Sequence, residues 1–186
     1  MNLKLQTGRL VLSPISLGDL QPIHELHSLP ETDKFNTLGI PENIDQTKTI
    51  VQHWVTKNEK KEDQSFTLKI ELKATGTFVG LIALNLGLPK FKIAEVWYKL
   101  HSNFWGKGYA TEALNEILGF GFDTLQLHRI EAGCAVDNLG SIRVLEKVGM
   151  FREGRKRKVL PLKQGWSDNF HYAILASDYS SKSTKK

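Results

Sequence analysis

The 186-residue sequence contains a single cysteine and no long apolar run. Cys134 has no second cysteine with which to form a disulfide, and no segment approaches the roughly 18 consecutive apolar residues that a membrane-spanning helix requires. The first ten residues, MNLKLQTGRL, lack the apolar core of a secretory signal. We therefore expect a soluble, cytoplasmic protein without disulfides and without a membrane partner.

A large excess of charge of one sign is also missing. The 25 Lys and Arg residues against 20 Asp and Glu give a net charge of +5, which favours anionic ligands but is small for a nucleic-acid-binding protein. The run RKRKV at 155–159 is the strongest argument for nucleic acid. In a strand its side chains alternate between two faces, and no aromatic residues lie between them for base stacking, so a solvated edge strand is the favoured interpretation.

The spacing of apolar residues predicts one α/β (α+β) domain. It indicates a strand, two helices, three strands, a helix, a strand, a helix and two final strands. The three central strands, SFTLKIEL, GTFVGLIALNL and KIAEVWYKL, are expected to form an antiparallel meander. No repeat or long linker divides the chain, so residues 1–178 form the predicted domain and residues 179–186 a polar tail.

The stretch WGKGYATEA at 105–113 places two glycines before the most regular amphipathic helix of the chain. A helix N-terminus has unpaired N–H groups and a partial positive charge, and glycines allow an anion to approach the backbone closely, so this pattern favours a phosphate site. The stretch is not a dinucleotide fingerprint, because Thr111 stands where its third glycine belongs, and it is not a Walker loop. An ordinary glycine turn is the remaining alternative.

A wider pattern resembles the GNAT superfamily of acyl-CoA-dependent N-acyltransferases. It runs from Glu95 to Ala113, EVWYKLHSNFWGKGYATEA, and continues after a strand as N-x-x-S-x-x-x-L-E-K-x-G-M. The chain is most similar to the branch that contains ribosomal-protein N-terminal acetyltransferases. The resemblance implies a mixed, mostly antiparallel sheet of six or seven strands with a splayed central strand pair and about four helices, and a possible homodimer.

By this resemblance acetyl-CoA is the cosubstrate, and no metal is implied. The phosphate loop aligns with residues 103–108, and the residues that hold the CoA pyrophosphate would be Trp105, Gly106, Lys107, Gly108, Tyr109 and Ala110. A solvated surface lysine is an equal interpretation of Lys107. The pantetheine arm would lie between the strand 96–101 and the strand 130–136, where an N–H group of Tyr98, Lys99 or Leu100 polarises the thioester carbonyl. Asn138 and Ser141 would contact the arm from the next helix, which Asn138 also caps.

Direct transfer from a thioester to an amine requires no nucleophilic side chain. The family often places a carboxylate where Glu95 stands, which makes it the candidate base, although an ordinary edge-strand glutamate is as good an interpretation. Glu131 is a weaker candidate because Arg129 is expected to pair with it. Many members protonate the departing thiolate with a tyrosine where this chain has Leu145, so Ser141 is the candidate hydrogen-bond donor. Cys134 is expected to be a core residue.

The acceptor is expected to be a primary amine, with a protein N-terminus favoured. Deprotonation at pH 7 costs about 1.1 kcal/mol for an α-amine against about 4.6 kcal/mol for a lysine. A small-molecule amine or antibiotic is the alternative acceptor, and an acyl-CoA sensor without catalysis is the alternative function. Phe35, Trp54 and Trp166 are candidate cleft residues, and Trp97 would either cover the sheet or narrow the acceptor side.

Overall fold

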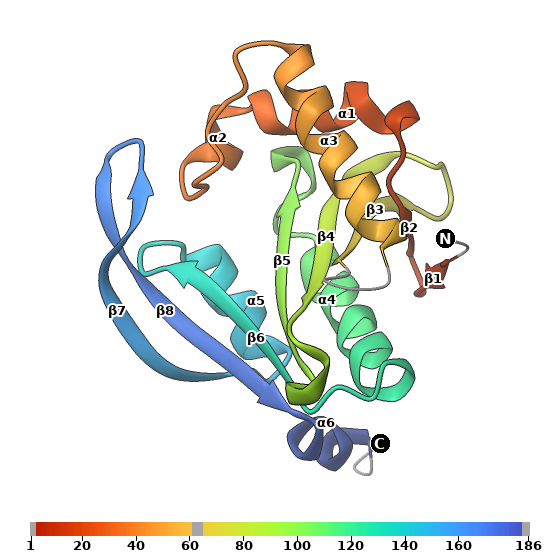
Figure 1. Ribbon diagram of the computed structural model, residues 1–186, viewed down its shortest axis with the longest axis vertical. Helices are drawn as coiled ribbons and strands as arrows, with labels where there is room; N and C mark the ends of the chain where they lie inside the picture. Colours follow the sequence, from red (N-terminus) through yellow and green to blue (C-terminus); the bar gives the residue numbers. More distant parts are fainter. Residues whose placement is uncertain (1–2, 61–64, 184–186) are drawn as a thin grey trace.

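The computed structural model describes residues 3–60 and 65–183 as helices packed on both faces of one sheet (Figure 1). The helices are α1 (Leu20–Ser28), α2 (Pro30–Asp33), α3 (Ile44–Glu59), α4 (Tyr109–Gly119), α5 (Leu139–Lys147) and α6 (Ala176–Ser183). The strands are β1 (Leu5–Gln6), β2 (Leu10–Pro14), β3 (Ser65–Leu72), β4 (Phe78–Leu86), β5 (Ile93–Leu100), β6 (Arg129–Ala135), β7 (Phe151–Leu162) and β8 (Gly165–Leu175). No helix within the described ranges is both long and apolar enough to cross a membrane.

The sheet has eight strands in the order β1-β2-β3-β4-β5-β6-β8-β7. All neighbouring strands are antiparallel except β5 and β6, which run parallel. The predicted mixed, mostly antiparallel sheet and its central meander are confirmed, and so is the edge position of the basic run, which lies in β7.

The numbers of strands and helices differ from the prediction. There are eight strands instead of six or seven because the first predicted strand turns after two residues. Thr7 closes that turn by accepting the N–H of Leu10 on its hydroxyl at 2.9 Å. The described residues contain six α-helices instead of four, since α2 and α6 were not predicted. Helix α6 includes part of the expected polar tail, and Tyr179 packs on Phe122 with ring centroids 5.1 Å apart.

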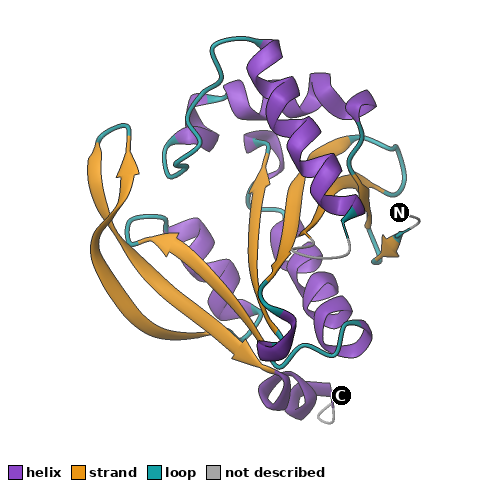
Figure 2. Ribbon diagram, viewed as in Figure 1, coloured by secondary structure: helices purple, strands orange, loops and turns teal. Residues whose placement is uncertain are grey.

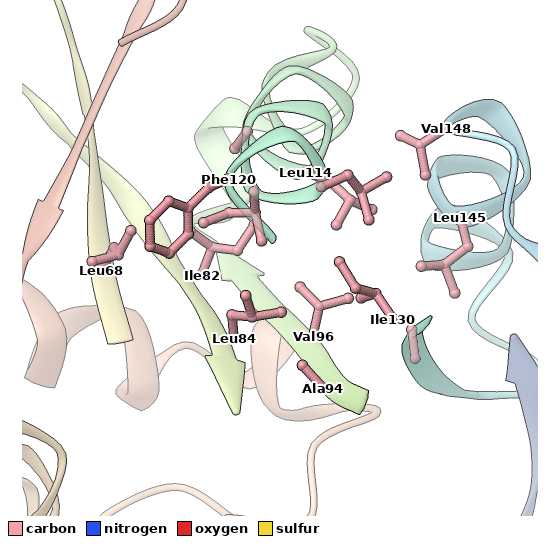
Figure 3. Close-up of a cluster of buried hydrophobic side chains, with 14 of the residues drawn as sticks. Leu68, Ile82, Leu84, Ala94, Val96, Leu114, Phe120, Ile130, Leu145 and Val148 are labelled. Atoms are coloured by element: carbon pink, nitrogen blue, oxygen red, sulfur yellow. The ribbon is translucent and has the colours of Figure 1, made fainter. Parts of the chain in front are cut away.

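The main core lies between the sheet and helices α4 and α5. Figure 3 shows Leu114 of α4 and Leu145 of α5 directed toward Val96 and Ile130, on the two central strands. The predicted apolar face of α4 is confirmed, because its residues at helical spacing are buried. These residues are Ala113, Leu114, Ile117 and Leu118.

A second, smaller cluster lies under α1 and α3 on the opposite face of the sheet. It contains Ile23 and Leu26 of α1, Val51 of α3 and Leu81 of β4. Helix layers on both faces explain why the central strands are nearly continuous apolar runs rather than simple alternations.

The two central strands separate in the middle of the sheet. β5 pairs with β6 only from Ile93 to Glu95, which lies opposite Glu131. On its other side, β5 pairs with β4 as far as Leu100. Figure 2 shows β5 and β6 diverging from this point. At Gly80 of β4 a Cβ atom would lie 2.3 Å from the backbone oxygen of Lys99, so β4 holds β5 at close range on this side. The predicted splayed pair is therefore present, and one edge of β5 has no strand beside it from Val96 onward.

Candidate active site

The divergence of β5 and β6 opens into a cleft with a volume of about 1220 Å³. Its wall is formed by β5 and β6, the loop before α4, the first turns of α4 and α5, and the segment from α1 to residue 38. Nearly all the residues predicted for the site line this one cleft. They are Glu95, Tyr98, Lys99, Leu100, Trp105, Gly106, Gly108, Tyr109, Ala110, Asn138 and Ser141.

The loop before α4 has the backbone geometry that an anion site requires. Gly106 and Gly108 have φ angles of +74° and +81°, a left-handed conformation that side chains disfavour, and Gly108 is the N-cap of α4. The first N–H groups of an α-helix have no partner within the helix. The amide of Trp105 is already used, because it donates to the carbonyl of Ser102 at 3.1 Å. The roles of Trp105 and of residues 106–110 in holding a pyrophosphate stay predictions.

Arg9 braces this loop from the turn between β1 and β2. Its guanidinium donates to the carbonyl of Lys107 at 3.1 Å and to the carboxylate of Glu112, in the first turn of α4, at 2.7 Å. It also stacks over the ring of Tyr109, 4.6 Å from the centroid. The sequence analysis missed Arg9, since these contacts span about 100 residues of chain and no local pattern reveals them.

Lys107 is not among the described residues that line the cleft. Its ammonium lies 5.5 Å from the ring centroid of Phe104, and its carbonyl accepts a hydrogen bond from Arg9. A role of the Lys107 side chain in binding CoA stays a prediction. Trp105 has a clearer structural role, because its indole N–H donates to the carbonyl of Leu100 at 2.8 Å and ties the loop to the end of β5.

Glu95 lies exposed at the point where β5 and β6 separate, and it lines the cleft. Its partner across the strands, Glu131, accepts a hydrogen bond from Arg129 at 2.6 Å, and Arg129 also binds Glu153. The predicted Arg129–Glu131 pair is confirmed. Of the two central glutamates, Glu95 is the one whose carboxylate faces the cleft without a hydrogen bond from any described residue, which suits a proton acceptor.

Ser141 and Asn138 lie at the start of α5 on the other side of the cleft. Asn138 caps the helix by accepting the N–H of Ser141 at 3.1 Å, as predicted. The hydroxyl of Ser141 is 2.8 Å from the hydroxyl of Tyr98. Burial raises the pKa of Tyr98, so the phenol stays protonated at neutral pH and can donate a hydrogen bond. Leu145, which stands where the resemblance predicts a tyrosine, is buried in the core.

The side chain of Tyr98 was not predicted as a proton donor, because the resemblance gave only its backbone a role. Alternation along β5 is the signal that finds it. Val96 belongs to the core under α4 and α5, so Tyr98 points to that side, toward Ser141, whereas Trp97 packs on the opposite face.

Cys134 is buried in the main core, as expected, although one side of it reaches the cleft. Burial raises the pKa of its thiol to about 11, with a smaller contribution from Glu146. A thiol with that pKa is almost entirely protonated at pH 7 and is a poor nucleophile.

Two of the three aromatic residues predicted to line the cleft do so, and the third does not. Phe35 and Trp54 line the cleft. Trp166 was predicted wrongly, because it is 61% exposed beside the turn between β7 and β8 and lies outside the described cleft wall. Trp97 packs on Trp54 with ring centroids 5.5 Å apart, covers the second cluster on the sheet and also lines the cleft, so it agrees with both interpretations.

Two basic residues lie beside Trp54 and Trp97 in the cleft wall, His27 of α1, which is buried, and Lys99 of β5, which is half-buried. The ammonium nitrogen of Lys99 is 3.1 Å from Nδ1 of His27. Burial lowers the pKa of His27 to about 3, and the charges of Lys99 and His24 add to this effect. His27 is therefore neutral in the folded protein at all moderate pH values.

This pair predicts a loss of stability in acid. The unfolded chain protonates His27 below pH 6.5 while the folded protein does not, so the contribution of His27 to stability falls as the pH falls. Between pH 7 and pH 5 we expect this group alone to remove about 2 kcal/mol from the free energy of unfolding. Urea unfolding at both pH values measures it, with His27→Gln as the comparison because Gln keeps an acceptor for Lys99. Equal losses in the two proteins would contradict the prediction.

Comparison with known proteins decides the family. Residues 9–151 match the acetyltransferase (GNAT) domain family. The chain belongs to the GNAT acetyltransferase family. This GNAT chain is 32% identical over 176 residues to the uncharacterized N-acetyltransferase YnaD of Bacillus subtilis, covering 95% of the chain and 99% of that relative. Family and relatives together identify it as an acyl-CoA-dependent N-acetyltransferase.

Solved structures share the fold of this GNAT chain. A GNAT-family acetyltransferase from Bacillus anthracis superposes with a TM-score of 0.82 at 28% identity, covering 94% of this chain and 99% of the other. RimL, a ribosomal L7/L12 α-N-protein acetyltransferase solved in complex with coenzyme A, gives a TM-score of 0.84 at 18% identity over 95% and 99%. A spermidine N(1)-acetyltransferase of Vibrio cholerae is 25% identical over 95% of this chain and 98% of its own length.

Proposed function

We propose that this GNAT acetyltransferase transfers the acetyl group of acetyl-CoA to the α-amine at a protein N-terminus. The observation that carries the proposal is that one cleft joins three features: glycine-bounded amides at the start of α4, an unpaired edge of β5, and the carboxylate of Glu95. The amides suit an anion, the β5 edge suits an extended arm, and the carboxylate suits the proton of an amine. We expect the protein to act in the cytoplasm and to form a homodimer.

The pyrophosphate would bind the N–H groups from Gly106 to Ala110, in the loop that Arg9 braces. The pantetheine arm would extend from there along β5, where backbone groups from Val96 to Leu100 face no strand and can pair with it. Acetyl-CoA supplies an activated acyl group, so the protein contributes orientation and charge stabilisation rather than a nucleophile.

In the transfer step we assign Glu95 as the group that accepts the proton of the attacking amine, directly or through water. A backbone N–H of the Tyr98, Lys99 and Leu100 segment would donate to the developing oxyanion. On the opposite side, the paired hydroxyls of Tyr98 and Ser141 would donate to the departing thiolate. This pair would replace the tyrosine that Leu145 displaces.

An α-amine suits a transfer step in which Glu95 is the proposed base, because such an amine is close to its deprotonated state at pH 7. A small-molecule amine is the second candidate acceptor, since the Vibrio cholerae relative is named for spermidine. A non-catalytic acyl-CoA sensor is a third function, and it differs from the proposal in a single measurable respect: it releases no CoA when an amine is added.

The test combines binding and turnover. Excess acetyl-CoA at about 100 times its dissociation constant should stabilise the protein by about 2.7 kcal/mol and raise the thermal midpoint by several degrees, whereas NAD should not. A peptide with a free N-terminus should then release CoA continuously, and the same peptide with a blocked N-terminus should not. Binding without release would support the sensor, and no thermal shift would contradict the acetyl-CoA site itself.

A further inference from the structure

The cleft wall contains the half-buried ammonium group of Lys99, and this side chain has no role in the proposed transfer step. Lys99 lies on the same face of β5 as Glu95 and Trp97, since side chains on a strand alternate between faces. Burial lowers the pKa of Lys99 to about 8, against an opposing effect of Asp33. The ammonium group therefore remains mostly charged at pH 7, and it has lost most of its contact with water.

Hydrogen-bond geometry around Lys99 leaves donors without acceptors. An ammonium group can only donate, so Nδ1 of His27 must accept, and the imidazole proton must lie on Nε2. Within residues 3–60 and 65–183, Nε2 of His27 is buried with no hydrogen-bond partner. The Lys99 ammonium can thus donate further hydrogen bonds, whereas Nε2 of His27 is buried and the pair has no free acceptor.

The opposing charge near this pair lies behind the wall. Asp33 interacts electrostatically with Lys99, but it is not among the described residues that line the cleft, whereas His27 and Lys99 are. The indole rings of Trp54 and Trp97 complete the wall, with centroids 5.8 Å between His27 and Trp54 and 5.5 Å between the two indoles. Aromatic walls exclude water and strengthen the attraction between the ammonium and an anion in the cleft.

The spacing of Glu95 and Lys99 defines a length. Each residue of a strand rises by about 3.3 Å, so Glu95 and Lys99 are about 13 Å apart along β5, and four residues of an extended acceptor peptide span the same length. In the proposed transfer step the attacking amine lies between Glu95 and the thioester carbonyl at the N–H groups of residues 98–100, so the residues that follow it in an acceptor peptide pass within reach of the Lys99 ammonium. A carboxylate at those positions would meet the cation, and an ammonium group would be repelled by it.

We propose that Lys99 is a specificity residue that selects acceptor peptides with acidic side chains at positions two to four and disfavours polyamines. The inference rests on the proposed function, because it places the attacking amine between Glu95, the proposed base, and the N–H groups of residues 98–100. It narrows the substrate class to acidic N-terminal segments.

The experiment compares two peptides that differ only in charge, one beginning Ser-Glu-Glu-Glu and the other Ser-Gln-Gln-Gln, with spermidine as a third acceptor. We expect kcat/KM of the wild-type protein to be about tenfold higher for the acidic peptide, the ratio that corresponds to about 1.4 kcal/mol. Lys99→Met should reduce the preference to less than about twofold, and Lys99→Arg should retain it. Lys48→Met, an exposed lysine of α3 outside the cleft wall, is the matched control and should keep the wild-type ratio.

Equal kcat/KM for both peptides, a preference for spermidine, or an unchanged preference in Lys99→Met would overturn the inference. If either Lys99 variant does not fold, the three wild-type rates still decide it. Failure of the proposed function gives a different result, since the wild-type protein would then show no acetyl-CoA thermal shift or acetylate neither peptide. Lys99→Met should keep that thermal shift, because its side chain lies on the face of β5 opposite Tyr98 and Ser141.

Discussion

Gly108→Val should remove most of the thermal stabilisation that acetyl-CoA gives to the wild-type protein. The φ angle of Gly108 is +81°, and a β-branched residue in that conformation costs about 1–3 kcal/mol. The added side chain would also stand at the N-cap of α4, next to the amides that we propose as the pyrophosphate site, and its Cβ would lie 3.4 Å from the guanidinium of Arg9. We expect the dissociation constant for acetyl-CoA to rise at least about 30-fold, equivalent to about 2 kcal/mol.

Gly76→Val is the matched control. Gly76 has a similar φ angle of +70°, and it lies not in the cleft wall but in the turn between β3 and β4, where an added Cβ would meet no atom within 4 Å. Both variants should lose stability without ligand, and only Gly108→Val should lose the response to acetyl-CoA. Calorimetric or fluorescence-detected melting with and without acetyl-CoA measures both effects. An undiminished response in Gly108→Val would refute the assignment of the loop.

Glu95→Gln should lower kcat about 100-fold, the lower end of the range for loss of a general base. The glutamine keeps the shape of the side chain and removes its ability to accept a proton at neutral pH. The deficit should shrink as the pH rises toward 9, because an α-amine then loses its own proton to solvent. KM for acetyl-CoA should change little, since the expected phosphate and pantetheine contacts do not involve this side chain.

Glu131→Gln provides the control for Glu95→Gln. Glu131 is the cross-strand partner of Glu95, carries the same functional group and is held by Arg129 away from the cleft. Its replacement should leave kcat within about twofold of wild type, an effect of less than about 0.5 kcal/mol. Steady-state rates of both variants against one peptide acceptor across pH 6–9 test the assignment. Equal deficits in the two variants would show that the glutamates support the sheet rather than the proton transfer.

The face of β5 on which Tyr98 lies could be predicted from the sequence, but its contact with Ser141 could not. Period-two alternation places Tyr98 on the α5 side of β5 and Glu95, Trp97 and Lys99 on the other. It does not give the 2.8 Å contact with Ser141, because that distance depends on how α5 docks on the sheet. The substitution of the usual tyrosine by Leu145 was visible in the sequence, and the hydroxyl pair that can take its place was not.

Local chemistry explains what the sequence determined by itself. The amphipathic face of α4, the glycines at its N-terminus, the Asn138 cap and the alternation of the central strands depend on residues close together in the chain, so their patterns can be read directly. The family resemblance then supplied the splay between β5 and β6, which no local pattern predicts.

The tertiary structure alone decided which groups meet across the cleft. Arg9 reaches the loop of Gly108, His27 reaches Lys99, and Trp166 lies outside the cleft, because each position is set by the packing of elements distant in sequence. Burial, which follows from that packing, also sets the low pKa of His27. The sequence thus determined the type of fold and the binding loop, and the assembled fold determined the charge and shape of the acceptor side.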